Sequence, residues 1–324
     1  MPNQQKKDFP QLTWDDRLEA DWRWLLTLAL VEDLGDPTGT GPQGDVTTLA
    51  LVPPEVAGHA AIVARQAGVV AGLPAVGPTF RETGGGLTFH AAAADGDRVA
   101  PGVELGRIEG PAAAILTVER LVLNLLGRLS GIATLTRRYV DAIAGTGARI
   151  YDTRKTTPGW RRLEKYAVRC GGGYNHREAL FAAVLIKDNH LALGAEREGS
   201  GVRFSPAEAV GRARRWLQQE HRAAVESMVE IEVDTLEQLE AVLPAGPDIV
   251  LLDNMAPPTL REAVALRDRI RPEVELEASG GVELGTVRAM ALSGVERISV
   301  GALTHSAPAL DLGLDMGPGR VRPW

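Results

Sequence analysis

The sequence predicts an α/β protein with two domains, and three observations lead to this prediction. Residues 57–115 contain short β-like runs separated by Gly, Asp and Pro, which indicates a small, mainly antiparallel sheet. After residue 145, apolar β-type runs alternate with helical stretches, a pattern typical of a parallel sheet covered by helices. A chain of 324 residues is long enough for two such domains.

Helical and loop segments surround the first sheet. Residues 1–13 are polar, and we expect a flexible arm there. Apolar residues recur at helical spacing between Trp14 and Leu34. The stretch 35–45 is dense in Gly and Pro and predicts a loop. A long helix is expected over 112–144, broken at Gly127 and at Ser130–Gly131 because glycine disfavours helix interiors.

The later runs favour a barrel over an open sheet. Nearly every run ends in polar residues, and the C-terminal strand ends of a (β/α) barrel meet at one face and build the active site. An open sheet would instead spread these ends along a line. The expected strands cover 148–152, 182–187, 228–233, 248–253, 273–279 and 297–302, with helices at 207–222, 235–243, 257–269 and 284–293.

Charged side chains follow these strands and predict an anion site that also holds a sugar. The carboxylates of Glu232 and Asp253 suit sugar hydroxyls or a divalent ion such as Mg²⁺. Gly-rich turns after the last two strands, at 279–281 and 300–302, suit a phosphate. Phosphates, a sugar, Mg²⁺ and a second acidic ligand suggest phosphoribosyl chemistry. The expected cations are Arg154, Lys155, His176, Arg177 and Lys187.

Each of these residues also has a structural interpretation. A single Arg or Lys at a strand end is usually a solvated charge, and only the grouping favours function. His305 is equally compatible with ligand contact and with structure. His190 has no partner at metal-ligand spacing, so a zinc site is not expected. Cys170 is expected to be structural because no His–acid arrangement accompanies it.

Composition restricts the class of partner and the compartment. The net charge of −7 argues against a general nucleic-acid binder. A single cysteine fits a reducing cytosol, and the first residues lack the apolar core of a signal peptide. The sequence contains no run of about 18 apolar residues, so we expect no membrane span. We therefore expect a cytoplasmic protein that binds neither nucleic acid nor membrane.

Several motifs resemble the quinolinate phosphoribosyltransferase family. They are DTRKTTPGWRRLEKYAVRCGGGYNHREAL at 152–180 and AAVLIKDNHL at 182–191, supported by ERLVLNLLGRLSGIAT, VEIEVDTLEQL, IVLLDN, LEASGGV and ISVGALTHS. The resemblance implies an N-terminal α/β open-faced sandwich domain and an incomplete (β/α) barrel, in a homodimer or a multiple of dimers. The domains expected are 14–130 and 131–305, with a C-terminal tail, 306–324, that packs on the N-terminal domain.

The resemblance also implies a reaction and a role for each residue. Quinolinate and phosphoribosyl pyrophosphate would give nicotinate mononucleotide, pyrophosphate and CO₂ in de novo NAD biosynthesis, with Mg²⁺. Arg154, His176 and Arg177 would grip the quinolinate carboxylates. Lys155 and Lys187 would face the pyrophosphate and the reacting centre, and Glu232 and Asp253 would hold ribose hydroxyls or Mg²⁺. Further substrate contacts are implied for Arg120 (in the neighbouring subunit's site), Thr153, Ser279, Gly280, Gly281, Val300, Gly301, Ala302 and His305.

Three other functions stay open on the residues alone. The first is a phosphoribosyltransferase for nicotinate or another pyridine, which would need fewer cations. The second is a barrel aldolase that uses Lys187 as a Schiff-base amine. The third is a non-catalytic sensor of phosphosugars. Two segments depart from the family pattern, namely the long loop 35–45 and an apparent insertion at 191–205.

Overall fold

The computed structural model describes residues 8–39, 43–196, 204–219 and 228–317. Contacts divide the chain into two compact units. Unit 1 combines residues 1–11, 138–155 and 173–301, and unit 2 combines 12–137, 156–172 and 302–324. The domain boundaries expected along the sequence remain predictions, because each unit is assembled from separate segments of chain.

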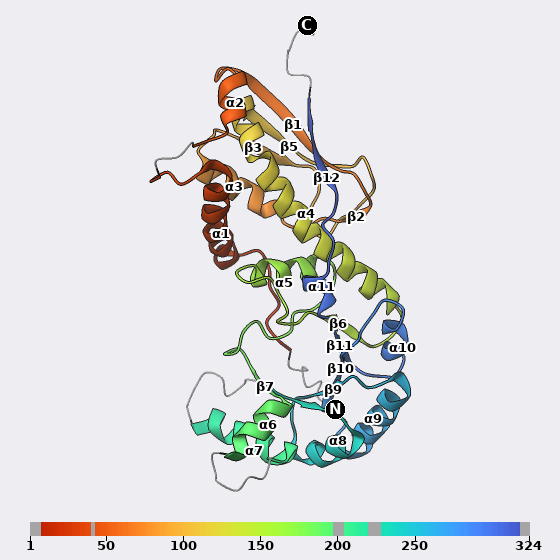
Figure 1. Ribbon diagram of the computed structural model, residues 1–324. Coiled ribbons are helices and arrows are strands. Elements are labelled where there is room, and N and C mark those ends of the chain that lie inside the picture. Colours follow the sequence, from red (N-terminus) through yellow and green to blue (C-terminus); the bar gives the residue numbers. More distant parts are fainter. Residues whose placement is uncertain (1–7, 40–42, 197–203, 220–227, 318–324) are drawn as a thin grey trace. The chain divides into compact units, whose positions relative to one another are not determined.

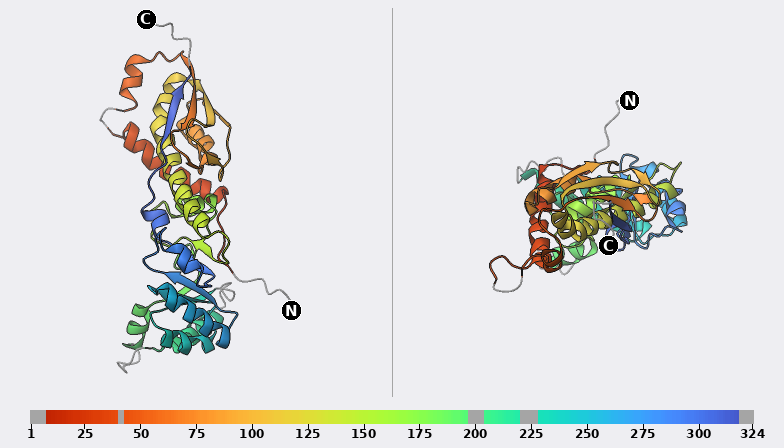
Figure 2. Two further views of the ribbon diagram at one scale, coloured as in Figure 1. Left: turned by 90° about the vertical axis from the view of Figure 1, so that its right-hand side faces the viewer. Right: turned by 90° about the horizontal axis from the view of Figure 1, so that it is seen from above.

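Unit 2 is an antiparallel sheet with helices on one face (Figure 1). Its strand order is β12-β1-β5-β3, and seen from above the strands and α4 form separate layers (Figure 2). Side chains of β1 and β5 share a buried core with α3 and α4, so these helices cover the apolar face of the sheet. The strands are β1 (Ala57–Ala64), β3 (Thr88–Ala91), β5 (Glu104–Pro111) and β12 (Leu312–Met316); a second, two-stranded sheet pairs β2 (Gly68–Val69) with β4 (Arg98–Val99).

The helices of unit 2 begin with the one that the spacing predicts. The side chain of Asp15 caps α1 (Asp16–Leu34) by accepting from the Leu18 N–H. The other helical elements are α2 (Val46–Leu51), η1 (Leu73–Ala75), α3 (Val76–Thr83), α4 (Ala112–Ala142), whose last five residues belong to unit 1, α5 (Arg161–Cys170) and α11 (Ala302–His305).

The expected break in the long helix is wrong, because α4 runs for 31 residues without interruption. Its glycines serve packing instead. A Cβ at Gly131 would lie 2.0 Å from the Pro308 carbonyl oxygen, and one at Gly127 would lie 3.0 Å from that of Leu310. The segment after α11 therefore crosses α4 at a distance that only glycine permits.

Unit 1 is a six-stranded parallel sheet in the order β6-β11-β10-β9-β8-β7. Among the described residues, no ladder joins the edge strands β6 and β7, as expected for an incomplete barrel. Figure 1 shows helices along the outside of these strands. The strands are β6 (Arg149–Tyr151), β7 (Val184–Ile186), β8 (Val229–Val233), β9 (Ile249–Asp253), β10 (Glu275–Ser279) and β11 (Arg297–Ser299), and the helical elements are α6 (Asp188–Glu196), α7 (Pro206–Gln219), α8 (Leu236–Val242), η3 (Leu243–Ala245), α9 (Pro257–Ile270) and α10 (Val287–Ala291).

Asp8 and Phe9 fill the end of the barrel where the strands begin. The Asp8 carboxylate accepts from the guanidinium of Arg149 at 2.9 Å and from that of Arg297 at 3.0 Å. Phe9 is buried in a cluster with residues at the starts of β7, β8 and β9. Of the arm expected over 1–13, residues 1–7 lie outside the described part of the chain, as do 40–42 of the expected loop and 197–203 of the apparent insertion.

Among the described residues, no helix is both long and apolar enough to cross a membrane.

Candidate active site

The loop after β6 is tied to the GGGYNHR segment by a buried carboxylate. Asp152 accepts from the Asn175 side-chain amide at 2.7 Å and from the His176 backbone N–H at 2.9 Å. An isolated parallel bridge joins Tyr151 to Tyr174. Through these contacts, unit 1 holds Thr153, Arg154 and Lys155 at the end of one strand and His176 and Arg177 beside it.

Arg154 and Arg177 are neighbouring cations whose charges repel. Burial lowers the pKa of Arg177, the positive charge of Arg154 lowers it further, and the negative charge of Glu230 opposes both effects. The Nε atoms of both side chains are buried and have no hydrogen-bond partner in the described structure. The Arg177 Nη1 donates a hydrogen bond to the Ala183 carbonyl at 3.0 Å. An anionic ligand would relieve this repulsion and satisfy both donors.

Two of the expected residues on neighbouring strands are paired with each other. Lys187 follows β7 and Glu232 lies on β8, and their Nζ and Oε2 atoms are 2.5 Å apart. Asp253 ends β9 and accepts from the Asn254 side-chain amide at 2.7 Å. Carboxylate oxygens at the ends of β8 and β9 match the oxygen ligands that Mg²⁺ prefers, so the donor chemistry of Glu232 and Asp253 fits that ion.

The turn after β10 interlocks with the turn after β9. Asn254 has a positive φ of 53°, and its N–H donates to the Ser279 carbonyl at 2.8 Å. Gly280 has φ 88°, and a Cβ there would lie 2.2 Å from the Asn254 Oδ1. Only glycine fits this position, which leaves backbone exposed at Gly280 and Gly281 for a close ligand.

The remaining expected residues come from two places. Val300 and Gly301 follow β11 in unit 1, and the Val300 N–H donates to the Tyr151 carbonyl at 2.9 Å. In unit 2, Arg120 is exposed on α4. Ala302 and His305 lie on α11, also in unit 2, and the His305 ring contacts the Ser306 hydroxyl at 2.7 Å.

Sequence reasoning missed two supports of this site. Asp152 was counted among the polar strand-end residues, but it is wholly buried and serves the loops. Glu230 was not singled out, because a glutamate on a strand usually points to the solvent-exposed face of the sheet. It is 1% exposed and lies 2.9 Å from the His176 Nε2. The alternation of Glu230 with Glu232 was the available signal, since both face the same side of β8.

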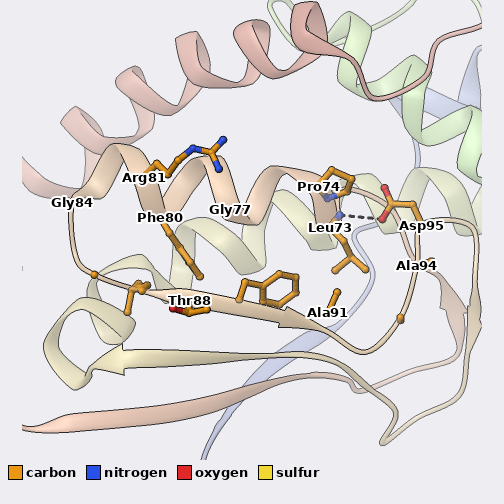
Figure 3. Close-up of a pocket in the computed structure, with 14 residues that line it drawn as sticks. Leu73, Pro74, Gly77, Phe80, Arg81, Gly84, Thr88, Ala91, Ala94 and Asp95 are labelled. Carbon is orange, nitrogen blue, oxygen red and sulfur yellow. Dashed lines mark hydrogen bonds between the residues drawn. The ribbon is translucent and has the colours of Figure 1, made fainter.

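A separate pocket of about 800 Å³ lies in unit 2, between α3 and β3 (Figure 3). Its walls are mostly apolar, with Phe80 and Phe89 among them. Its carboxylate, Asp95, already accepts from the backbone N–H groups of Gly72 and Leu73 and from the Tyr166 hydroxyl. None of the expected site residues line it, and its Arg81 guanidinium already lies 2.9 Å from the Glu19 carboxylate.

Comparison with known proteins gives a consistent result. The family model for the quinolinate phosphoribosyl transferase N-terminal domain matches residues 45–130, and that for the C-terminal domain matches 132–315. The nicotinate-nucleotide pyrophosphorylase [carboxylating] of Mycobacterium leprae (strain TN) is 43% identical over 274 residues, which cover 84% of this chain and 91% of that protein. The probable nicotinate-nucleotide pyrophosphorylase [carboxylating] of Bacillus subtilis (strain 168) is 39% identical over 292 residues, covering 90% and 92%.

A solved structure agrees with these relatives. The nicotinate-nucleotide pyrophosphorylase from Francisella tularensis superimposes with a TM-score of 0.82 at 31% identity, over 96% of this chain and all of that one. Family models and relatives thus cover both the sheet of unit 2 and the barrel of unit 1. The chain belongs to the quinolinate phosphoribosyltransferase family.

Proposed function

We propose that this protein transfers the phosphoribosyl group of phosphoribosyl pyrophosphate to quinolinate, releasing pyrophosphate and CO₂ and leaving nicotinate mononucleotide for NAD biosynthesis. The names of the relatives support this reaction. The observation that carries it is the buried guanidinium of Arg177 beside the half-buried, mutually repelling Arg154, with the Nε atoms of both side chains buried and without a hydrogen-bond partner in the described structure. Quinolinate bears two adjacent carboxylates, and arginine binds a carboxylate with a planar fork of donors.

The cations nearest the pyrophosphate in this proposal are Lys155 and Lys187. Positive charge develops on the ribosyl carbon as the quinolinate ring nitrogen attacks and pyrophosphate leaves. The lysines offset the negative charge of the leaving group, and the carboxylates of Glu232 and Asp253 face the sugar. Mg²⁺, when held by these two carboxylates, would supply further neutralisation of the pyrophosphate. Thr153 and the backbone of 279–281 and 300–302 would position the ribose and its 5-phosphate, and His305 is proposed to contact substrate.

Decarboxylation then proceeds on the ring itself. The carboxylate next to the new pyridinium nitrogen leaves as CO₂, the electron pair of the broken C–C bond stays on the ring carbon, where the positive nitrogen stabilises it, and this carbon takes a proton from water to give nicotinate mononucleotide. Holding the two anionic substrates in register supplies much of the rate, which explains the density of cations.

The ion pair of Lys187 argues against the aldolase alternative. A Schiff-base lysine needs a neutral amine in a dry pocket. Here the Lys187 Nζ lies 2.5 Å from the Glu232 Oε2 and the side chain is 44% exposed, so Lys187 lies neither alone nor in a dry pocket.

We further propose a homodimer, or a multiple of dimers, in which Arg120 completes the partner's site. An exposed apolar face on α1, formed by Trp24, Leu28 and Val31, supports the assembly. Residues of α1 and α4 also line a hollow of about 520 Å³. The α4 residues in its wall are Leu121, Asn124 and Leu125, which closely follow Arg120 in the sequence.

Mixing two inactive variants tests the shared site. If Arg120 acts across the dimer, Arg120→Ala and Lys155→Ala should each be inactive alone. Random mixing of their subunits should then restore about a quarter of the wild-type activity, because half of the dimers hold one intact site of two. Absence of recovery, with heterodimers verified by mass spectrometry, would place Arg120 outside the partner's site.

The reaction itself is tested with purified protein, phosphoribosyl pyrophosphate and Mg²⁺, with quinolinate in one sample and nicotinate in the other. Pyrophosphate and CO₂ in equal amounts from quinolinate alone are expected. Turnover of nicotinate without CO₂ would indicate the pyridine alternative, and binding without turnover would indicate a sensor. The small ligands, the net charge of −7 and the single cysteine support a cytoplasmic enzyme that acts on neither nucleic acid nor membrane.

A further inference from the structure

The imidazole of His176 is held from three sides inside unit 1. Its Nδ1 accepts a hydrogen bond from the Arg177 backbone N–H at 2.8 Å. Its Nε2 lies 2.9 Å from Glu230 and 3.6 Å from Glu277. The Phe9 ring lies 4.4 Å from it, centroid to centroid. The side chain is 7% exposed, so this ring has little room to turn.

These contacts define the protonation of the ring. A nitrogen that accepts a hydrogen bond carries no proton, so the hydrogen-bond network assigns the N–H to Nε2. The Glu230 and Glu277 carboxylates lie 2.9 and 3.6 Å from Nε2, and within the described structure their oxygens have no hydrogen-bond partner. Nδ1 is therefore engaged by the Arg177 backbone, and Nε2 is enclosed by two buried carboxylates that need a donor, which leaves neither nitrogen turned toward a substrate carboxylate.

The assignment of the N–H to Nε2 also argues against a metal ion held by His176, Glu230 and Glu277. One histidine and two carboxylates are a common ligand set for transition metals. A histidine that binds metal through Nε2 normally donates its Nδ1–H to a neighbour. Here Nδ1 accepts, and the proton on Nε2 occupies the place that a metal would take.

We propose that His176, with Glu230 and Glu277 behind it, is a positioning unit for Arg177 rather than a direct substrate ligand. This inference rests on the proposed function, in which Arg177 binds a quinolinate carboxylate. Glu230 and Glu277 lie inside the barrel on β8 and β10, at 1% and 0% exposure. They fix the Nε2 side of the ring, and its Nδ1 fixes the backbone of Arg177.

The pair of arginines explains why such a support is needed. Before an anion arrives, Arg154 and Arg177 repel each other, and repulsion favours conformations in which they separate. A backbone N–H anchored at 2.8 Å and an Nη1 anchored on Ala183 hold Arg177 at both ends. The site then binds quinolinate without ordering this side chain first, which lowers the entropic cost of binding.

Two substitutions of His176 separate the roles of its nitrogens. The side-chain oxygen of His176→Asn lies where Nδ1 does and still accepts from the Arg177 N–H. The longer His176→Gln places its amide near Nε2 and leaves that N–H without its acceptor. Quinolinate dissociation constants, measured by titration calorimetry, should be close to wild type for His176→Asn and about 5- to 10-fold weaker for His176→Gln, the effect of one hydrogen bond.

Two substitutions of Glu230 test the carboxylate side of the ring. Glu230→Ala should weaken quinolinate binding, and Glu230→Gln, which keeps an oxygen for the Nε2–H, should restore most of it. Binding of phosphoribosyl pyrophosphate should not change in either variant. Glu275→Gln is the control, because Glu275 lies on the same face of β10 but pairs with Arg297. It should lower the melting temperature and leave quinolinate binding unchanged.

The reverse order of the two His176 variants, or equal weakening in both, would overturn the proposal. Weakening by Glu275→Gln equal to that by Glu230→Ala would also overturn it, since a general loss of packing would then explain both. Wild-type turnover is measured in parallel. Quinolinate that binds but is not converted would refute the proposed reaction while the binding series still decides the role of His176, and a wild type that does not bind quinolinate would refute both.

Discussion

Glu164 of α5 lies 2.6 Å from the guanidinium of Arg128 on α4, and the Glu164 side chain is completely buried. The same carboxylate accepts from the backbone N–H and the hydroxyl of Thr157, at 3.1 and 2.9 Å. Arg128 also donates to the carbonyl groups of Thr304 and Ala307. Within unit 2, one ion pair therefore holds both the TTPG turn and the end of α11.

Removing one member of this pair should be costly. Glu164→Ala leaves Arg128 and Thr157 without their acceptor, and we expect a loss of about 3–5 kcal/mol in the free energy of unfolding. Glu164→Gln keeps an acceptor and should lose less. Urea unfolding of both variants measures this difference, and equal losses would show that the charge, rather than the hydrogen bonds to Thr157, matters.

The pair of Lys187 and Glu232 should matter for turnover and little for stability, unlike the pair of Arg128 and Glu164. Their pair is partly exposed, so Lys187→Met should change the free energy of unfolding by no more than about 1 kcal/mol. Turnover should fall by about 100-fold or more, because a cation beside the leaving pyrophosphate is lost. Steady-state kinetics and thermal unfolding of the same sample test this. A large loss of stability with intact kcat would mean that the pair is structural.

Gly280 and Gly281 offer a matched comparison at the expected phosphate turn. Both have positive φ, but a Cβ at Gly280 would meet Asn254 at 2.2 Å, whereas one at Gly281 would meet nothing within 4 Å. Gly280→Ala should raise KM for phosphoribosyl pyrophosphate strongly. Gly281→Ala should raise this KM less, because its Cβ leaves the interlocked turns in place, and should cost about 1–2 kcal/mol of stability through backbone strain. Similar KM values in the two variants would contradict a role for the interlocked turns.

Burial raises the pKa of Glu277 from its ordinary 4.5 to about 7; His176 and Arg297 oppose this rise, and the charge of Glu230 adds to it. Between these two pH values the folded protein keeps a proton that the unfolded chain releases. The free energy of unfolding should therefore fall as the pH rises from about 4.5 through 7.

Glu277→Gln cannot titrate and is the reference for this effect. From pH 5 to pH 8, wild type should lose on the order of 1–3 kcal/mol relative to the variant, measured by urea unfolding. A constant difference between the two proteins over this range would show that the carboxyl group is ionised throughout.

The sequence predicted the strands of the barrel well, because buried parallel strands form apolar β-branched runs that end in polar residues. All six expected runs contain strands, from β6 to β11. The short helices α3 and α5 were not expected. The sequence of α5, RRLEKYAVRC, places Glu164 and Lys165 where solvent would be expected, yet both are buried. Partners distant in sequence, such as Arg128, determine this burial.

Local rules failed for a similar reason at the glycines of α4. Gly127 and Gly131 predict a break by helix propensity, but the close passage of residues 308–310 selects them. For the site, residue type and position led to the choice of Arg154, Arg177, Lys187 and Glu232, whose roles stay predictions. The contacts of His176 were beyond such reasoning, because the direction of a ring within a barrel depends on Phe9 and Glu230, which no local pattern connects to it.

The filling of the barrel by Asp8 has a consequence for the order of folding. Asp8 and Arg297 are 289 residues apart in the sequence, yet they share a hydrogen bond. On the ribosome, the early segment must wait until β11 has been made before this contact can form. The strands β6 to β10 therefore emerge with the barrel interior open, and contacts of such long range slow folding and prolong exposure to aggregation. Completion of unit 1 is therefore a late step, which can only follow the synthesis of β11.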